Sequence, residues 1–320
     1  MTPRRSDIVL ASRGSRLALR QAEIVSEALR AAHPDLDVHI RAVTTKGDRD
    51  RRPFAAISGK GLFTSEVERE VVEGRADVAV HSAKDLTADL APGCAVVCVP
   101  EREWPGDVVV GGEGTSGEER LASLSVGATV GTSSIRRRLL VAEARSDLEI
   151  VDLRGNLDTR LEKVARGDVT AAILAAAGLA RLGVRDGARL DPTSWVPAPA
   201  QGALALEALE ERTDLVALLQ PIHDSVAVRE VDCERAFAAR LEGGCSVPLG
   251  CLARVEHGHL VATGFLGDPS GGPALRDRVS GPAAEARKLG QELAGALLAS
   301  GGDEVVAEVL RSQTPLPSPP

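Results

Sequence analysis

Short apolar runs alternate with amphipathic stretches over the first 200 residues, which is the pattern of a layered α/β protein with a mainly parallel sheet. Short runs predict strands, and apolar residues that recur every three or four positions predict helices. The predicted strands are Ile8–Ala11, Val38–Val43, Val78–His81, Val96–Val99, Val108–Val110, Thr129–Gly131, Ile150–Leu153 and Ala171–Ala175. The predicted helices are Leu17–Ala32, Thr64–Glu73, 134–145 and 157–166.

Two similar series of elements follow each other, separated by Trp104-Pro105-Gly106, so we predict two α/β lobes in succession. The proline-rich segment 195–202 indicates a stiff link, after which Ala203–Glu207 returns as a strand to the first lobe. A third unit is predicted with helices over 224–241, 283–299 and 303–312 and strands over 249–254, 259–266 and 275–280. The expected domains are residues 1–100 with 200–219, residues 104–196 and residues 222–312, followed by a disordered tail at 313–320.

Composition narrows the class of partner. The 320-residue chain has a net charge of −8, only 2% aromatic residues and no Tyr. A nucleic-acid surface needs cationic tracks and stacking aromatics, so no nucleic-acid partner is expected. Five cysteines without a Cys-x-x-Cys pair argue against a disulfide framework and a structural zinc site, so no metal is expected. No apolar stretch is long enough for a signal sequence or a membrane span, so we expect a cytoplasmic protein without membrane contact.

Three predicted strands end in one local pattern: a Ser or Asn that can cap the next helix, with arginine at the junction. The three modules are Arg13 with Ser15, then Ser134 with Arg136 and Arg137, then Asn156 with Arg154 and Arg160. Arginine in a first helical turn opposes the helix dipole by about 0.3–1 kcal/mol, so the repetition indicates an anionic ligand. The guanidinium fork favours a ligand with several carboxylates or phosphates, and Arg136→Leu or Arg154→Leu should then leave folding intact. The alternative is a solvated basic face paired with Glu143, Asp147 and Asp158.

A fourth strand end supplies an acid, Asp85, next to Lys84. If these cations converge, Asp85 should have a lowered pKa and remain ionised, which suits it to stabilise a cation. His81 is either a functional switch or ligand, or a histidine that is simply hydrogen-bonded at a strand end. The Gly-flanked Lys60 lacks the rest of a phosphate-binding Walker loop, and we expect it to be an anion contact.

Cys245 lies in a loop that displays its thiol. Gly243 and Gly244 precede it, Pro248 stops a helix from resuming, and the helix before it ends near Leu241. The negative end of that helix disfavours a thiolate, so the site suits a durable covalent anchor better than a nucleophile. The alternative is a small apolar residue in a tight turn.

Two other patterns resemble ligand sites but favour structural roles. The segment Gly112–Gly117 matches G-x-G-x-x-G, but Glu118 and Glu119 would face a pyrophosphate, so dinucleotide binding is not expected. The segment His257-Gly258-His259 is typical of a hairpin tip rather than a metal site.

An ordered set of motifs from about residue 7 to residue 310 resembles the porphobilinogen deaminase family, also called hydroxymethylbilane synthase. The motifs are Arg13-Gly14-Ser15-Arg16-Leu17-Ala18-Leu19, Gly59-Lys60-Gly61-Leu62-Phe63, His81-Ser82-Ala83-Lys84-Asp85, Gly131-Thr132-Ser133-Ser134-Ile135-Arg136-Arg137, Leu153-Arg154-Gly155-Asn156 and Leu241-Glu242-Gly243-Gly244-Cys245. The resemblance implies two lobes like type II periplasmic binding proteins plus a smaller C-terminal α/β domain. It also implies a dipyrromethane cofactor held by a thioether to Cys245. Four porphobilinogen units would join head to tail with loss of ammonia, giving hydroxymethylbilane for tetrapyrrole synthesis.

By this resemblance, Asp85 would hold pyrrole N–H groups and stabilise the azafulvene cation formed on deamination. The residues implied to bind cofactor or substrate are Arg13, Ser15, Lys60, Ser82, Lys84, Thr132, Ser133, Ser134, Arg136, Arg137, Arg154, Gly155, Arg160, Arg181 and Gln201. Departures from the family pattern at Lys46, Ala83, Thr87 and Ser246 put the Lys46 contact and loop packing in doubt.

We therefore expect a monomeric transferase. Two rivals are a non-catalytic anion-binding protein of the same two-lobed architecture and a ligand-sensing module of a regulator. The displayed Cys245 argues against the first, and the lack of a basic helix-turn-helix segment argues against the second.

Overall fold

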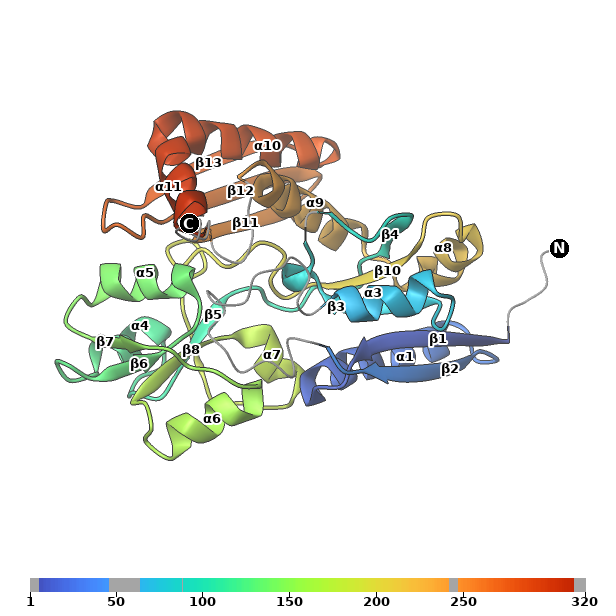
Figure 1. Cartoon of the computed structure of the whole chain (residues 1–320), viewed down its shortest axis with the longest axis horizontal. Helices are drawn as coiled ribbons and strands as arrows, with labels where there is room; N and C mark the ends of the chain where they lie inside the picture. Colours follow the sequence, from blue (N-terminus) through green and yellow to red (C-terminus); the bar gives the residue numbers. More distant parts are fainter. Residues whose placement is uncertain (1–5, 46–63, 88, 242–246, 314–320) are drawn as a thin grey trace, which may run out of the picture.

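A computed structural model describes residues 6–45, 64–87, 89–241 and 247–313, which form three sheets with their own helices (Figure 1). Lys46, Lys60, Cys245 and Ser246 lie outside the described residues, as does most of the predicted tail. None of the helices in the described part of the chain combines the length and apolarity that a bilayer crossing requires.

The first lobe is a five-stranded sheet in the order β2-β1-β3-β10-β4. Its strands are β1 (Asp7–Arg13), β2 (Asp37–Val43), β3 (Val78–Ser82), β4 (Cys94–Cys98) and β10 (Leu204–Leu209). Its helices are α1 (Arg16–Ala32), α3 (Ser65–Val72), α8 (Thr213–Leu219) and the 3-10 turns η2 (Ala83–Asp85) and η3 (Gln220–Ile222). Alternation along β1 divides the core, because Ile8 and Leu10 pack with α1 whereas Ala11 packs with α3.

The second lobe repeats this arrangement in the order β7-β6-β8-β5-β9. Its strands are β5 (Asp107–Val110), β6 (Thr129–Gly131), β7 (Glu149–Val151), β8 (Ala171–Ala175) and β9 (Ala188–Arg189). Its helices are α4 (Gly117–Ala122), α5 (Ile135–Ala144), α6 (Leu157–Ala165) and α7 (Ala176–Arg181). The shared strand order and the double crossing between lobes confirm the two-lobed α/β class that was expected.

Both sheets are mainly parallel, as expected, since four of the five strands in each sheet run in the same direction. In the first lobe β1 is parallel to β2 and β3, but β10 is antiparallel to both β3 and β4. In the second lobe β6 is parallel to β7 and β8, but β5 is antiparallel to β8 and β9. The one antiparallel strand in each sheet has a topological cause: β5 and β10 each follow a crossing from the other lobe, and each enters its sheet in the opposite direction to the other strands. The predicted return of residues 203–207 to the first sheet is confirmed by β10.

The third unit packs two helices on a three-stranded antiparallel sheet, in the order β11-β12-β13. It consists of α9 (Ser225–Arg240), β11 (Leu249–Glu256), β12 (His259–Leu266), β13 (Leu275–Pro282), η4 (Ala283–Glu285), α10 (Ala286–Leu297), the π-turn η5 (Leu298–Gly302) and α11 (Asp303–Gln313). Gly290 permits the close approach of α10 to α9, because a Cβ there would lie 2.1 Å from the Cys233 carbonyl oxygen. Helix α11 extends one residue into the predicted tail.

Besides the 3-10 turns η2 and η3, four short elements were not predicted: α4, α7, α8 and β9. Helix α4 begins at the end of the glycine-rich segment Gly112–Gly117. There the Ser116 hydroxyl accepts from Glu119 N, and the Glu119 carboxylate accepts from Ser116 N. This capping box gives the segment a structural role at the start of α4. The predicted hairpin tip is also confirmed, since β11 and β12 are antiparallel and both His257 and Gly258 have positive φ.

A buried ion-pair network connects both inter-lobe crossings to the third unit. Arg102, on the first crossing, lies 3.0 Å from Glu230 and 2.8 Å from Glu234 of α9, and it also donates to the Gln201 carbonyl on the second crossing. Glu234 accepts in turn from the backbone N–H groups of Ala200 and Ala253. Each charge in this network has a partner, so the network fixes α9 against the junction of the lobes.

Candidate functional site

The predicted strand-end residues of the two lobes meet at the lobe junction through Gln201. Lys84 Nζ, in η2 of the first lobe, lies 3.3 Å from Gln201 Oε1. Arg137 Nη2, in α5 of the second lobe, lies 3.3 Å from the same oxygen. Gln201 Nε2 donates to the Pro105 carbonyl at 2.6 Å and to Asp107 Oδ1 at 2.8 Å. One buried amide on the second crossing therefore joins Lys84 to the interior of the second lobe.

Asp107, which sequence reasoning missed, lies at the centre of this network. It is fully buried at the start of β5, 2.9 Å from Arg136 Nη2 and 2.7 Å from Arg137 Nη2. Burial alone would raise the pKa of Asp107, but the two guanidinium groups hold it well below its usual range. The sequence held one signal for Asp107: it is an acid at the first position of the otherwise apolar run Asp107–Val110. An acid in a buried strand requires a cationic or hydrogen-bonding partner.

Arg136 and Arg137 are buried rather than displayed. Arg136 also donates to the Val196 carbonyl at 2.7 Å, and Arg137 donates to the Ile173 carbonyl at 3.1 Å. These contacts argue against the expectation that Arg136→Leu leaves folding intact, because Asp107 would keep a buried charge with one partner fewer. Whether either arginine also contacts a ligand stays a prediction.

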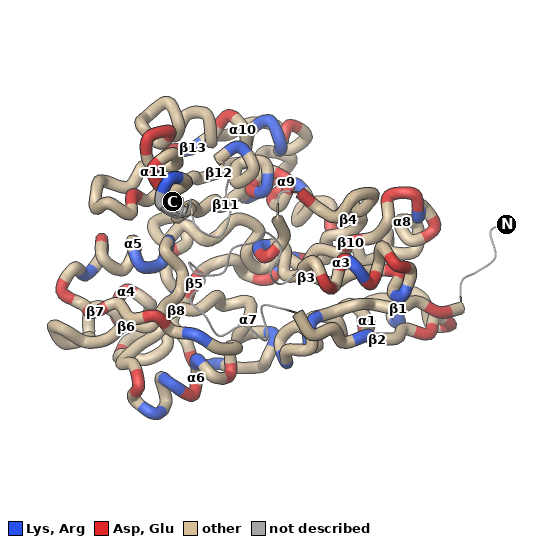
Figure 2. Tube along the Cα trace, viewed as in Figure 1, with Lys and Arg blue, Asp and Glu red and all other residues tan. Residues whose placement is uncertain are grey.

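The alternative of a solvated basic face is not what the described residues form. The three acids proposed as partners pair elsewhere: Glu143 with Arg276, Asp147 with Arg145 and Asp158 with Arg16. The Arg16–Asp158 pair, at 2.7 Å, joins α1 of the first lobe to α6 of the second. Figure 2 shows acidic and basic positions next to one another along the outer helices α6 and α10, as is typical of solvated helix surfaces.

The module before α6 is built differently from the module before α5. Arg154 Nε lies 2.5 Å from Asp152, and Arg160 Nε donates to the Gly155 carbonyl at 3.0 Å. Gly155 has φ +111°, and a Cβ there would lie 2.8 Å from the Thr159 side chain, so this turn requires glycine. Within the described residues no carboxylate lies within salt-bridge distance of Arg160. Burial, followed by repulsion from Arg137, lowers the pKa of Arg160 to about 10.

Lys84 and Asp85 follow β3 at the floor of the junction. Both residues are exposed overall. Desolvation of the Lys84 ammonium group nevertheless lowers its pKa to about 8, against the attraction of Asp85. The negative charge of Asp85 acts on Lys84 and on Arg160. The structure therefore brings Asp85 together with cations from both lobes, as the sequence predicted. The predicted lowering of the Asp85 pKa stays a prediction.

The polar cap residues hold the turns in place. Ser15 Oγ accepts from Ala18 N at 3.3 Å, and Ser134 Oγ accepts from Arg137 N at 3.4 Å, as predicted. Asn156 precedes α6, but its side chain makes no cap hydrogen bond, so the third cap prediction is wrong. Thr132 Oγ1 accepts from Ser134 N, Ser133 Oγ donates to the Leu153 carbonyl, and Ser82 Oγ bonds Gln21 at 2.9 Å.

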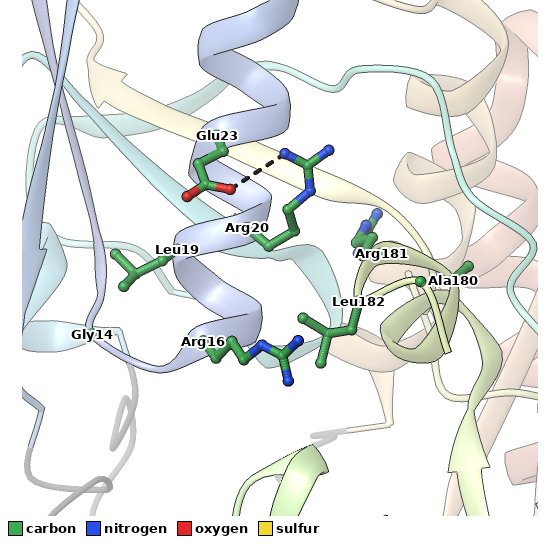
Figure 3. A pocket seen from close by; sticks show the side chains of 9 residues that line it. Gly14, Arg16, Leu19, Arg20, Glu23, Ala180, Arg181 and Leu182 are labelled. Atoms are coloured by element: carbon green, nitrogen blue, oxygen red, sulfur yellow. Dashed lines mark hydrogen bonds and ion pairs between the residues drawn. The ribbon is translucent and has the colours of Figure 1, made fainter. Parts of the chain in front are cut away.

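Two cavities adjoin these residues. A pocket of about 740 Å³ lies between α1 and the end of α7, where Arg16 faces Leu182 and Arg20 is paired with Glu23 (Figure 3). Arg181 lines this pocket and donates to the Gly202 carbonyl at 2.6 Å, and burial lowers its pKa to about 10. A cavity of about 20 Å³ lies on the first lobe, and it is lined by Arg13, Ala18, Gln21, Thr64, Val80, His81, Ser82 and Asp85.

The described cysteines are not candidates for an exposed thiol. Cys94, Cys98, Cys233 and Cys251 are all buried and free. Burial raises the pKa of Cys98 and of Cys233 to about 12. Among the described residues no group of His, Cys, Asp and Glu could hold a metal ion.

Two family models together match most of the chain. The model described as "Porphobilinogen deaminase, dipyromethane cofactor binding domain" matches residues 8–217. The model described as "Porphobilinogen deaminase, C-terminal domain" matches residues 228–299. Among solved structures, the methionine binding protein MetQ aligns with 72% of this chain and 95% of its own at 12% identity, with a TM-score of 0.43.

Individual relatives match over nearly their full length. The porphobilinogen deaminase of Syntrophotalea carbinolica is 41% identical over 314 residues, which span 97% of this chain and 98% of that relative. The porphobilinogen deaminase of Paraburkholderia phytofirmans is 43% identical over 314 residues, which span 96% of this chain and 91% of that relative. Identity at this level, over all three structural units, means that the chain belongs to the porphobilinogen deaminase family.

Proposed function

We propose that this chain joins four porphobilinogen molecules head to tail, with loss of one ammonia for each, into hydroxymethylbilane, while a dipyrromethane cofactor remains bound to Cys245 through a thioether. The observation that carries the proposal is the meeting of Asp85 with Lys84 and Arg160 at the lobe junction. A substrate rich in carboxylates needs such cations, and a step that forms a carbocation needs such an acid.

The described residues fit a polycarboxylate pyrrole. Lys84 and Arg160 lack a salt-bridge partner among the described residues, and burial lowers the pKa of both. A bound carboxylate would neutralise each of them, so a ligand with acetate and propionate groups would stabilise the site. When bound, the dipyrromethane would supply the pyrrole α-carbon that the first substrate joins.

The chain's own residues would then act as follows. Asp85 accepts from the pyrrole N–H of the substrate and stabilises the positive charge that develops as the amino group leaves. The two arginines before and in α6 and the ammonium of Lys84 hold the carboxylates, and Gln201 keeps Lys84 in place through its 3.3 Å contact. The remaining proposed contacts are Arg13, Ser15, Lys60, Ser82, Thr132, Ser133, Ser134, Arg136, Arg137, Gly155 and Arg181.

The burial of the four described cysteines supports attachment of the cofactor at Cys245. The four described cysteines are buried in the cores of the first lobe and the third unit, where burial raises the pKa of each thiol. A buried thiol with a raised pKa is a poor site for covalent attachment. Free thiols also suit a reducing compartment, so we propose that the enzyme is cytoplasmic. We also propose that it works as a monomer.

Intact-mass measurement of the purified protein tests this function. We expect an adduct of two linked pyrrole units, absent in Cys245→Ser and retained in the control Cys98→Ala, with stepwise heavier species when porphobilinogen is limiting. Asp85→Asn should keep its fold and lose product formation by about 10²–10³-fold. An unmodified chain that does not consume porphobilinogen would favour the anion-binding rival and overturn the proposal.

A further inference from the structure

Three ionisable side chains are buried together on the α3 face of the first sheet, and the proposed function does not use them. They are His81 on β3, Glu207 on β10 and Glu68 on α3, exposed by 5%, 0% and 8%. His81 Nε2 lies 3.1 Å from Glu207 Oε2. Glu68 is near enough that the charges of both Glu207 and His81 act on it. We call these three residues the buried triad.

The triad is not neutralised in the way the other buried acids are. Within the described residues, neither oxygen of Glu207 accepts a well-aligned hydrogen bond, and His81 Nε2 lies within ion-pair distance of Glu207 but off the hydrogen-bond direction. Asp107 and Glu234, by contrast, each have an arginine within 3 Å. A buried carboxylate without such a partner is stable only if it holds a proton or shares one.

The charges around the triad favour one stored proton. Burial, and then the like charge of Glu207, raises the pKa of Glu68. The Cys94 thiol on β4 faces Glu207, and burial followed by the Glu207 charge raises the pKa of Cys94 to about 12, so this thiol stays protonated. Arg235 on α9 also feels the Glu207 charge, although burial lowers the pKa of Arg235. Two carboxyl groups therefore compete for limited positive charge.

The small cavity connects the triad to the candidate site. Its lining includes His81, together with Thr64 at the start of α3, and it also includes Arg13, Ser82 and Asp85. Its volume of about 20 Å³ exceeds the roughly 10–15 Å³ that one water needs, and its polar lining offers that water several partners. A single water there would join Asp85 to the triad.

Building on the proposed function, we propose that His81, Glu207 and Glu68 form a proton store that exchanges one proton with Asp85 through a water in this cavity. In each condensation the C–N bond of the substrate would break, with its electron pair leaving on ammonia, and a C–C bond would form between the pyrrole α-carbon and the substrate methylene. The α-carbon then loses its C–H bond, whose electron pair restores the aromatic ring, and the proton passes to Asp85. The store takes this proton and returns Asp85 to its ionised form for the next substrate. The proton leaves the store to bulk water, where it balances the ammonia released as ammonium.

The stored proton is tested in the substrate-free enzyme by infrared spectroscopy. We expect a protonated-carboxyl band near neutral pH that shifts in D₂O, is lost in Glu68→Gln or Glu207→Gln and is retained in the exposed control Glu210→Gln. This readout does not depend on turnover. A wild-type spectrum without such a band would overturn the proton store.

The exchange with Asp85 is tested by single-turnover kinetics of the cofactor-loaded enzyme across pH. Glu207→Gln removes the carboxylate that lies 3.1 Å from His81 Nε2, so the rate should fall about tenfold and the acidic limb of the pH–rate profile should shift. The wild-type proton inventory in mixed H₂O and D₂O should be curved and become linear in the variant, while His39→Gln changes neither. An unchanged pH profile and inventory in Glu207→Gln would overturn the exchange. The adduct on Cys245 and product formation would persist in that case, so the proposed function would stand.

Discussion

The two arginine modules of the second lobe look alike in sequence but differ in what neutralises them. Before α5, Arg136 and Arg137 are buried and share Asp107, which is itself fully buried. Before α6, Arg154 pairs with a half-exposed Asp152, and Arg160 meets only a backbone carbonyl among the described residues. The first module is electrostatically complete without a ligand, whereas the second is not. The comparison teaches that the position of an acid on a neighbouring strand decides whether such an arginine is available to a ligand.

The largest expected effect is on the α5 side. Asp107→Asn leaves two buried guanidinium groups without a carboxylate, and we expect a loss of about 3–5 kcal/mol in the free energy of unfolding. Urea unfolding measures it, and Asp147→Asn, which removes an exposed partner of Arg145, should cost less than about 1 kcal/mol. A cost for Asp107→Asn as small as that of the control would remove the distinction between the modules.

A smaller effect is expected on the α6 side, and it should appear in binding rather than in stability. Arg160→Leu removes a charge that has no salt-bridge partner among the described residues, so the free energy of unfolding should change by less than about 1 kcal/mol. The KM for porphobilinogen should rise roughly ten- to hundredfold, the loss of one charge-assisted hydrogen bond of about 1.5–3 kcal/mol. The control Arg166→Leu, at the exposed end of α6, should change neither quantity. Loss of stability with normal KM would make Arg160 a structural residue.

The smallest expected effect is a pH dependence that arises at Lys84. Because its pKa is lowered to about 8, Lys84 carries its charge below that pH and loses it above. The affinity for porphobilinogen should therefore fall by up to roughly tenfold between about pH 7 and about pH 9. Lys84→Arg keeps its charge over this range, so its KM should stay flat. The same decline in Lys84→Arg would assign the pH dependence to another group.

Local patterns were sufficient to predict most strands and the larger helices. The predicted bounds of Thr129–Gly131, Ala171–Ala175 and 259–266 match β6, β8 and β12, because turn residues lie shortly before each apolar run. Helix α7 was missed because the apolar run continues from β8 into Ala176–Arg181 without a break in pattern. The antiparallel direction of β5 and β10 depends on the path between lobes, which no local pattern records.

Site residues that are close together in the sequence could be predicted from local motifs. Site residues that meet only through the packing of distant elements could not. Lys84 and Asp85 are adjacent in sequence and were found together. Asp107 is a partner of Arg136 only because β5 and α5 pack together, and Glu207 meets His81 only because β10 inserts beside β3. Such pairs span 29 and more than 100 positions of the chain, so spacing alone could not reveal them.

The late arrival of β10 has a consequence for synthesis on the ribosome. The second sheet is complete once residue 189 has been made, but the first sheet lacks the strand between β3 and β4 until residue 209 emerges. The nascent chain thus exposes an open strand edge on β3 while the whole second lobe is translated. Domains generally fold as units during translation, so the second lobe can fold first although it is encoded second. The nascent first lobe is then the part of this protein that most needs a chaperone to cover it.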